Sequence, residues 1–270
     1  MTDTDVARLI NGERLVVLGW GRAILMQVAH PLVAAGVDQH STFRASVVAP
    51  FVRLHGTVQT MLDLTFGDEA TASRAAARVN AIHDRVHGVL GGAAGVWPAD
   101  TRYAAHDPAL LQWVHATLLD SLPLAYEAFV APLTPALVDR YALEAAGGAA
   151  RLGIPESMAP RSRADVRLYL ERMLTSGQIA VTPMAKALAH DVLNPPGSRL
   201  LGPVSAVTRL FAIGTLPETM RDMYGFGWTD ADTQRLVRLC AFLRRWRART
   251  PAWLARWREG RSVGVPPVRS

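Results

Sequence analysis

The feature that most constrains the fold is the spacing of the apolar residues, which recur every three or four positions in most stretches of the chain. This spacing is typical of helices, because 3.6 residues complete one turn. The chain has no sustained alternation of apolar and polar residues, and its β-branched runs are short, which disfavours strands. The pattern therefore predicts an all-α fold.

Short breaks containing proline and glycine separate the helical stretches and read as turns within one domain. The 270 residues are enough for one substantial core. We expect a single domain over residues 1–270, a multi-helix bundle with a basic C-terminal tail at about 243–270. The predicted helices are residues 3–12, 19–29, 31–37, 50–66, a helix from about 68 that includes 78–87, then 107–131, 134–153, 162–176, 183–193, 199–213, 217–224 and 230–247.

The formal net charge is +6, and nearly all basic residues are arginines, because Lys186 is the only lysine. Much of this charge lies in Leu243–Arg249 and Arg256–Arg258, next to tryptophans. One interpretation is a surface that contacts a membrane or a nucleic acid. The other, which we favour, is a solvated final helix whose tryptophans pack back on the core, because no nucleic-acid motif accompanies the charge. We expect no nucleic-acid partner, and a peripheral membrane contact remains open.

The cysteine count and the N-terminus bear on the compartment. Cys240 is the only cysteine, so an internal disulfide is impossible and a reducing compartment is favoured. The acidic N-terminus lacks the features of a secretory signal. The apolar stretch 16–37 is interrupted by polar residues and by Pro31, which favours a buried helix-turn-helix over a membrane span. We expect a cytoplasmic protein.

Two neighbouring stretches carry the residues most suited to chemistry. Arg53 and Thr57 are one helical turn apart and therefore share a face. His83 falls on a mostly apolar stripe that should face inward, where a histidine is either a hydrogen-bonded core residue or a ligand. The other members of that stripe are Ala76, Val79, Asn80, Val86, His87 and Leu90.

His83 and His87 have the i, i+4 spacing with which one helix can grip a metal. Zinc proteases place a glutamate after the first histidine, whereas this chain has the shorter Asp84, and a third ligand would have to come from His115 or Glu127. A zinc hydrolase is thus a weaker alternative. Among the other histidines we expect His115 to be buried.

Two further histidines have expected places. His30 should form a structural hydrogen bond across the Pro31 turn, and His106 should be exposed. A haem is one ligand that a buried histidine could bind. Covalently attached haem is excluded because Cys-x-x-Cys-His is absent, and thiolate-ligated haem is excluded because Cys240 lies in an ordinary amphipathic helix. A haem would have to be held by an imidazole. The Gly88–Gly95 segment lacks the Gly-Lys-Ser/Thr ending of a phosphate loop.

A series of motifs runs through nearly the whole chain: the run 21–37 followed by His40-Ser41 and Phe43-Arg44, Arg53-x-x-x-Thr57, Arg78-Val-Asn-x-Ile-His83-Asp-x-Val, Leu111-x-Trp-Val-His-Ala-Thr-Leu-Leu-Asp-Ser121, Tyr126-Glu-x-Phe129, Leu216-Pro and Tyr224-Gly. In combination and order they resemble the MpaB-type and latex-clearing-protein (rubber oxygenase) family. The resemblance implies an all-helical fold around a b-type haem, and cleavage of isoprenoid carbon–carbon double bonds with dioxygen.

By this resemblance His83 is the axial ligand of haem iron, and Arg53 and Thr57 are the distal arginine and threonine. Rubber-cleaving members have a lysine directly before that threonine, where this chain has Gly56, so we expect a more open distal site. Asn80 and His87 stand where those members have arginines. Asn80, one turn before His83, is the predicted hydrogen-bond partner of its second ring nitrogen.

The sequence thus predicts an all-α bundle enclosing a b-type haem pocket, with His83 on the iron. Arg53 and Thr57 are the candidate catalytic residues, and Asn80 and His87 also belong to the predicted cofactor site. The predicted reaction is oxygenation or oxidative cleavage of a C=C bond in an apolar, isoprenoid-like small molecule. The alternatives are a non-catalytic haem- or lipid-binding protein and the zinc hydrolase. The oligomeric state is left open.

Overall fold

The computed structural model describes residues 5–40, 49–195 and 202–261, and it is 72% helical. In the described residues the only sheet is a hairpin of β1 (His87–Val89) and β2 (Arg102–Ala104). The predicted all-α class is confirmed. The α-helices are α1 (Val6–Asn11), α2 (Gly19–Val28), α3 (Pro31–His40), α4 (Ala49–Phe66), α5 (Glu69–His83), α6 (Pro108–Phe129), α7 (Pro135–Arg151), α8 (Arg163–Thr175), α9 (Pro183–Leu193), α10 (Gly202–Gly214), α11 (Glu218–Tyr224), α12 (Asp230–Arg249) and α13 (Ala252–Ala255), with 3₁₀ turns η1 (Arg14–Leu18), η2 (Glu156–Met158) and η3 (Arg258–Gly260).

Capping residues fix where several helices begin. The side chains of Asp68, Thr134, Ser162 and Thr182 each accept a hydrogen bond from a backbone N–H three residues on. Such a cap stabilises a helix by about 1 kcal/mol. Proline occupies the first position of α6, α7 and α9, where its missing N–H costs nothing. These signals are local, so the helix starts agree closely with the prediction.

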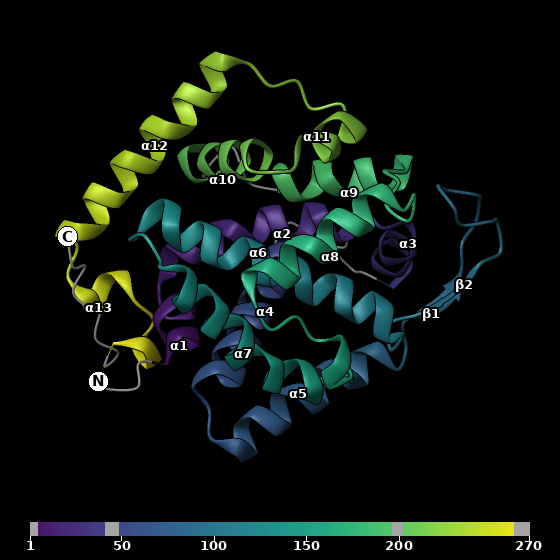
Figure 1. Ribbon diagram of the computed structural model, residues 1–270, viewed down its shortest axis with the longest axis horizontal. Helices are drawn as coiled ribbons and strands as arrows, with labels where there is room; N and C mark the ends of the chain where they lie inside the picture. Colours follow the sequence, from purple (N-terminus) through teal and green to yellow (C-terminus); the bar gives the residue numbers. More distant parts are fainter. Residues whose placement is uncertain (1–4, 41–48, 196–201, 262–270) are drawn as a thin grey trace.

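The centre of the molecule is the pair α2 and α6, around which the other helices are arranged (Figure 1). Gly19 allows the close approach, because a Cβ there would lie 2.8 Å from the Cβ of Ala125 and 2.9 Å from the backbone oxygen of Ser121. Eight of the ten residues of α2 are buried, which confirms the expected buried helix-turn-helix. Large side chains from both helices, including Met26 of α2 and Trp113 and Tyr126 of α6, form the main core.

A buried arginine, paired with a partly exposed aspartate, joins α2, α6 and the residue after α10. Arg22, 4% exposed, places Nη2 2.6 Å from Asp120 Oδ2 and donates from Nη1 to Ser121 Oγ at 2.7 Å. Its Nε donates to the backbone oxygen of Thr215 at 2.8 Å. A buried charge costs free energy unless it is paired and hydrogen-bonded, and Arg22 meets both conditions.

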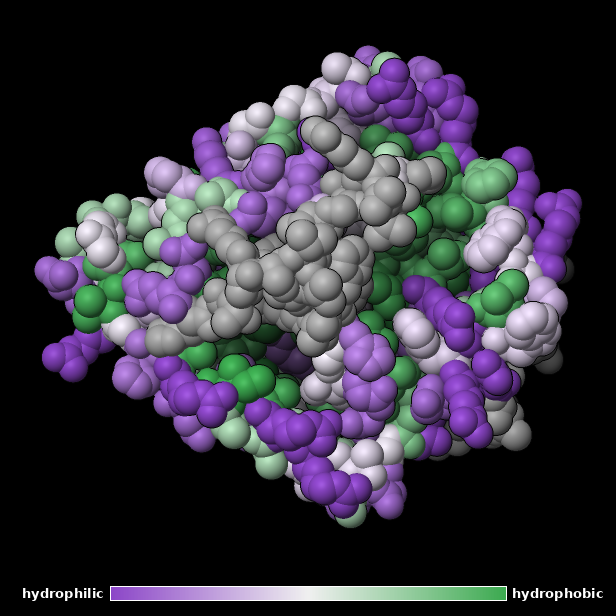
Figure 2. Space-filling model, turned by 180° about the vertical axis from the view of Figure 1, so that it is seen from behind, coloured by the Kyte–Doolittle hydropathy of each residue, from purple (hydrophilic) through white to green (hydrophobic). Residues whose placement is uncertain are grey.

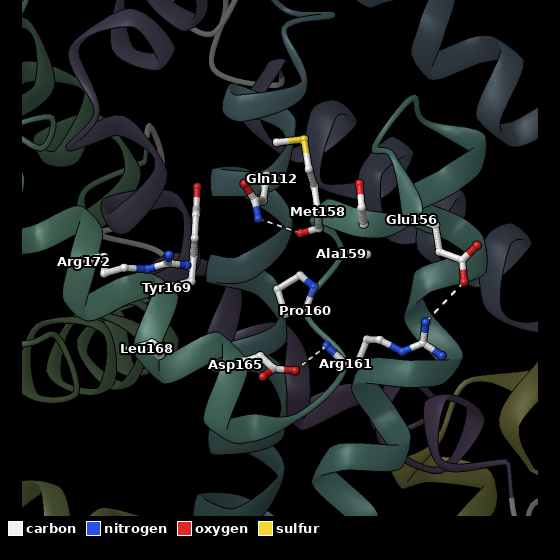
Figure 3. A pocket seen from close by; sticks show the side chains of 11 residues that line it. Gln112, Glu156, Met158, Ala159, Pro160, Arg161, Asp165, Leu168, Tyr169 and Arg172 are labelled. Atoms are coloured by element: carbon white, nitrogen blue, oxygen red, sulfur yellow. Dashed lines mark hydrogen bonds and ion pairs between the residues drawn. The ribbon is translucent and has the colours of Figure 1, made fainter.

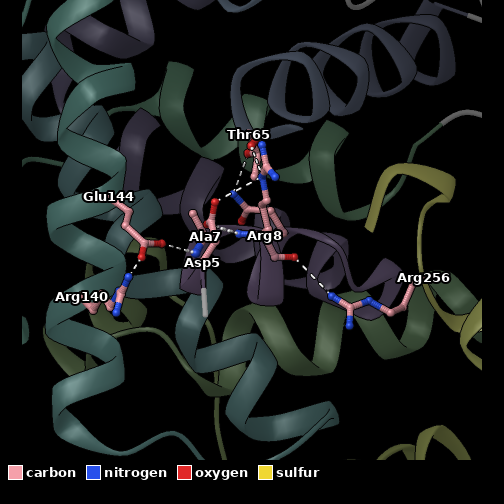
Figure 4. A network of polar contacts seen from close by, with 8 residues as sticks. Asp5, Ala7, Arg8, Thr65, Arg140, Glu144 and Arg256 are labelled. Atoms are coloured by element: carbon pink, nitrogen blue, oxygen red, sulfur yellow. Dashed lines mark hydrogen bonds and ion pairs between the residues drawn. The ribbon is translucent and has the colours of Figure 1, made fainter. Parts of the chain in front are cut away.

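The N-terminal helix is tied to three other parts of the chain (Figure 4). Glu144 of α7 accepts from the N–H of Ala7 and pairs with Arg140. Arg8 donates to the backbone oxygen of Thr65 at the end of α4. Arg256, beyond α13, donates to the backbone oxygen of Arg8 at 3.2 Å. These contacts fix α1 against α4, α7 and the C-terminal segment.

The main departure from the predicted elements follows His83. Helix α5 ends at that residue, and His87 begins β1, where it pairs with Ala104 of β2. The hairpin lies against α3, since the hydroxyl of Tyr103 donates to Gln39 Oε1 at 2.7 Å. The prediction that His83 and His87 share one helical face is therefore wrong.

In the described ranges no single helix is long and apolar enough to cross a membrane. Residues 14–28 and 31–39 reach that length and composition only as a pair, with a bend of 108° between them. Seen from behind, the surface shows hydrophobic residues exposed between hydrophilic clusters (Figure 2).

Candidate functional site

His83 lies at a junction of α5, the β-hairpin and the start of α6. Its ring is half-buried and meets the ring of His106 edge-on, with centroids 5.6 Å apart and an interplanar angle of 80°. His106 Nε2 lies 2.7 Å from Asp84 Oδ1. The hairpin brings these residues together, because β2 leads directly into His106 and then into the capping residue of α6.

The electrostatic setting keeps His83 neutral near pH 7. Burial lowers the pKa of His83, the neighbouring His106 lowers it further, and Asp84 opposes the shift. The Nδ1 atom of His83 is buried and has no hydrogen-bond partner. A neutral imidazole with an unused ring nitrogen can bind a metal or accept a proton.

Asn80 does not hydrogen-bond to His83, contrary to the prediction. Its Nδ2 donates instead to the backbone oxygen of Arg151 at 3.0 Å, which ties α5 to α7. Its Oδ1 is buried without a partner, as is His83 Nδ1 one turn later. The two unused atoms are chemically complementary, since one can donate and the other accept.

Arg53 and Thr57 both belong to α4, which packs against α5 through the turn at Gly67. Thr57 is exposed, and the side chain of Arg53 lies outside the described residues. Arg53 lies 13 residues before the end of α4, and His83 lies 14 residues after the start of α5. Each residue is therefore about 20 Å from the turn along its own helix axis. Their predicted position on opposite walls of one pocket stays a prediction.

Two other histidines are also held neutral by burial. His30 is 2% exposed, and its Nδ1 accepts from the N–H of Leu32 at 3.3 Å, which confirms the predicted bond across the Pro31 turn. Burial lowers the pKa of His30 to about 4, with Asp107 opposing the shift. Burial also lowers the pKa of His115 to about 4, and its buried Nε2 has no hydrogen-bond partner. The ring nitrogen of His115 is thus buried, as expected, although the residue as a whole is partly exposed.

The pair of His106 and Asp84 beside His83 is what sequence reasoning missed. His106 is partly exposed, as expected, but its contact with His83 depends on the hairpin, which no helical pattern predicts. The zinc alternative loses its geometric basis, because His87 is on β1. Among the described residues no group of three or more His, Cys, Asp or Glu side chains could hold a metal ion.

A separate pocket of about 550 Å³ lies between α6, η2 and α8 (Figure 3). Its polar wall includes Gln112, which donates to the backbone oxygen of Met158 at 2.6 Å, and Arg161, which pairs with Glu156. Burial raises the pKa of Tyr169, on another wall, to about 12, so this phenol stays protonated. The pocket is lined by none of the residues predicted from the sequence.

A family model described as "ER-bound oxygenase mpaB/B'/Rubber oxygenase, catalytic domain" matches residues 7–245. The chain belongs to this oxygenase family. No curated protein and no solved structure matches the chain. The predicted membership of the mpaB/rubber oxygenase family is therefore confirmed.

A haem group, which the family resemblance implies for this chain, requires a neutral imidazole with one ring nitrogen free for the iron. His83 meets this condition, because it is half-buried, its pKa is lowered, and its unbonded Nδ1 can take a hydrogen-bond acceptor that leaves Nε2 for the iron. His115 also meets it through Nε2. The donor chemistry of the chain thus fits an axially ligated haem, and only the family motif distinguishes His83.

Proposed function

We propose that this protein is a haem b-dependent oxygenase that acts with dioxygen on a C=C bond of an apolar, isoprenoid-like small molecule. The observation that carries the proposal is the match of an oxygenase catalytic domain to residues 7–245. The neutral, half-buried imidazole of His83, one ring nitrogen of which has no partner, supports it. We expect the protein to work in the cytoplasm, because a chain with a single cysteine forms no internal disulfide and therefore suits a reducing compartment.

In this proposal His83 would hold the haem iron. If the side chain of Asn80 rotates, its unused Oδ1 can accept a hydrogen bond from the Nδ1–H of His83. This bond would fix the tautomer of His83 and leave Nε2 for the iron. His106, held by Asp84, limits the rotation of the His83 ring. Haem, when bound, supplies dioxygen binding and activation at its iron.

Two residues of α4 complete the proposed site. Arg53 would supply a fixed positive charge that stabilises negative charge developing on the reacting oxygen. Thr57, one turn later on the same helix, would supply a hydroxyl donor. Gly56 stands where rubber-cleaving members have a lysine, so the side of the site formed by Arg53 and Thr57 would be more open. This difference favours a substrate smaller than rubber.

Absorbance of protein expressed with added haem tests the cofactor. We expect a Soret band in the wild type, its loss in His83→Ala, and its retention in His106→Ala and His115→Ala. A Soret band unchanged in His83→Ala contradicts the assignment. Loss of the band in His115→Ala alone transfers the axial role to that residue.

The reaction is tested by reducing the holoprotein anaerobically, adding squalene as a polyene probe and admitting ¹⁸O₂. We expect ¹⁸O in carbonyl products, and a roughly 100-fold or larger loss of turnover in Arg53→Gln with the Soret band retained. Haem without oxygen-dependent product from a panel of isoprenoids indicates a haem-binding protein. Bound zinc without a Soret band indicates a hydrolase.

A further inference from the structure

Helix α12 has two faces of opposite character, and its inner face is accounted for. Leu236, Cys240 and Leu243 contact the buried rings of Phe129 and Phe211. Farther along the same face, Arg247 reaches a buried carboxylate near the N-terminus. Packing of this face therefore holds α12 on α6 and α10.

The outer face carries aromatic side chains where a solvated helix carries polar ones. Phe242 is 62% exposed and Trp246 is 44% exposed. Arg238, Arg245 and Arg249 lie beside them. Positions 238, 242, 245 and 249 are three or four residues apart, so they lie on one side of the helix. The tryptophans of the basic segment were expected to pack back on the core: Trp257 does so, whereas for the exposed Trp246 the expectation is wrong.

The amphipathic surface continues past the end of α12. Trp253 and Leu254 of α13 are 63% and 44% exposed. Figure 1 shows α12 and α13 along one outer edge of the molecule, with the outer side of α12 uncovered by other helices. We call Arg238, Phe242, Arg245, Trp246, Arg249, Trp253 and Leu254 the α12 edge.

The arginines of the α12 edge are available to a ligand. Arg238, Arg245 and Arg249 form no ion pair within the described ranges, whereas Arg235 pairs with Asp232 and Arg247 pairs with Glu13. Three arginines without an ion pair, on a surface with exposed aromatic rings, match a partner that is anionic and partly apolar.

We propose that the α12 edge binds the surface of an anionic lipid bilayer. Tryptophan and phenylalanine sit favourably at the boundary between headgroups and acyl chains, while arginine side chains extend to the phosphates. A nucleic acid matches the charge but leaves the aliphatic Leu254 and the outer side of α13 without a role. This inference is independent of the haem proposal.

The test is sedimentation of the full-length protein with vesicles of phosphatidylcholine alone or with 30% phosphatidylglycerol. We expect binding to the anionic vesicles only, weakened by salt. Arg238→Gln/Arg245→Gln/Arg249→Gln should reduce the partition coefficient about 100-fold, since each arginine near an anionic surface contributes about fivefold. Phe242→Ser/Trp246→Ser should reduce it by at least tenfold at unchanged charge.

Helix α8 offers a control away from the α12 edge, because Arg167, which pairs with Glu171, and its neighbours Leu168 and Arg172 are exposed there. Arg167→Gln/Leu168→Ser/Arg172→Gln should bind vesicles as the wild type does. Circular dichroism of each variant confirms folding. Equal loss in the control, unchanged binding in the α12 variants, or binding of single-stranded RNA without binding of anionic vesicles each overturns the proposal.

Discussion

Two ionisable side chains inside this protein, the carboxylate of Glu13 and the imidazole of His83, differ in how many hydrogen-bond partners they have. Glu13 is fully buried and accepts from Arg247 at both oxygens, each at 2.6 Å, while Arg256 Nε lies 3.5 Å away. At His83 the ring nitrogen Nδ1 and the nearby Asn80 Oδ1 are buried without partners. The contacts of Glu13 join the two ends of the chain, whereas at His83 one hydrogen-bond donor or acceptor on each of two side chains is unused.

The difference separates groups that stabilise the fold from groups that are available to a ligand. The Glu13 carboxylate has both oxygens paired with a guanidinium, and removing one partner of a buried ion pair is strongly destabilising. A buried polar atom without a partner lowers stability and persists where a function needs it. The comparison therefore predicts large stability losses at Glu13 and small ones near His83.

Glu13→Gln should have the largest effect, lowering the free energy of unfolding by about 3–5 kcal/mol. The amide removes the negative charge and leaves Arg247 and Arg256 buried together without a counter-charge. Urea unfolding followed by circular dichroism at pH 7 measures the change. Thermal unfolding of the same variant shows whether the C-terminal segment detaches first.

The matched control is Glu69→Gln, which removes a surface carboxylate that also pairs with an arginine, Arg151. Exposed ion pairs contribute little, so this variant should unfold with the wild type. If both substitutions have equal effects, burial does not distinguish the two pairs and the comparison fails.

The next largest effect concerns pH and His115. Its pKa is about 4 in the folded protein and near 6.5 when the chain unfolds. Between these values the unfolded chain binds more protons, so stability is fully present above pH 6.5 and falls as pH drops toward 4, by about 3 kcal/mol in total. Unfolding midpoints in urea at pH 7, 6, 5 and 4.5 trace this loss.

His115→Leu should flatten part of that dependence, because leucine cannot be protonated. His30, which has a similar pKa, keeps its own share. His190→Gln is the control, since the side chain of His190 is exposed. A pH dependence that is unchanged in His115→Leu would show that this imidazole is not held neutral by burial.

Most helices could be predicted from the sequence because their signals are local. Asp68, Pro108 and Thr134 specify helix starts within three residues of themselves, and the structure places the starts there. The end of α5 could not be predicted, since an apolar stripe continues to Leu90 while the chain turns into β1. What overrides the helical pattern is contact with α3, where Val86 and Tyr103 pack beside Gly36.

In the candidate site, too, some features could be predicted from the sequence and others depend on the tertiary structure. The family motif located His83, and periodicity located the buried His115. Asn80 was misassigned because position on a helix does not determine a side chain's partner, and Arg151 of α7 offered a backbone oxygen. The contact of His83 with His106 joins residues 23 positions apart across the hairpin. Only tertiary structure reveals such a pair.

The smallest effect gives the sharpest test, because it compares two asparagines. Asn11 uses both ends of its amide, donating to Thr65 Oγ1 at 3.0 Å and accepting from the hydroxyl of Tyr141 at 3.3 Å. Asn11→Ala should lower the free energy of unfolding by about 2 kcal/mol, since two buried groups lose their partner. Asn80→Ala should cost less than about 1 kcal/mol, because removing the unbonded Oδ1 offsets the lost bond to Arg151. Equal losses in urea unfolding would mean that Asn80 Oδ1 has a partner in solution, and the case for a ligand-ready cluster around His83 would weaken accordingly.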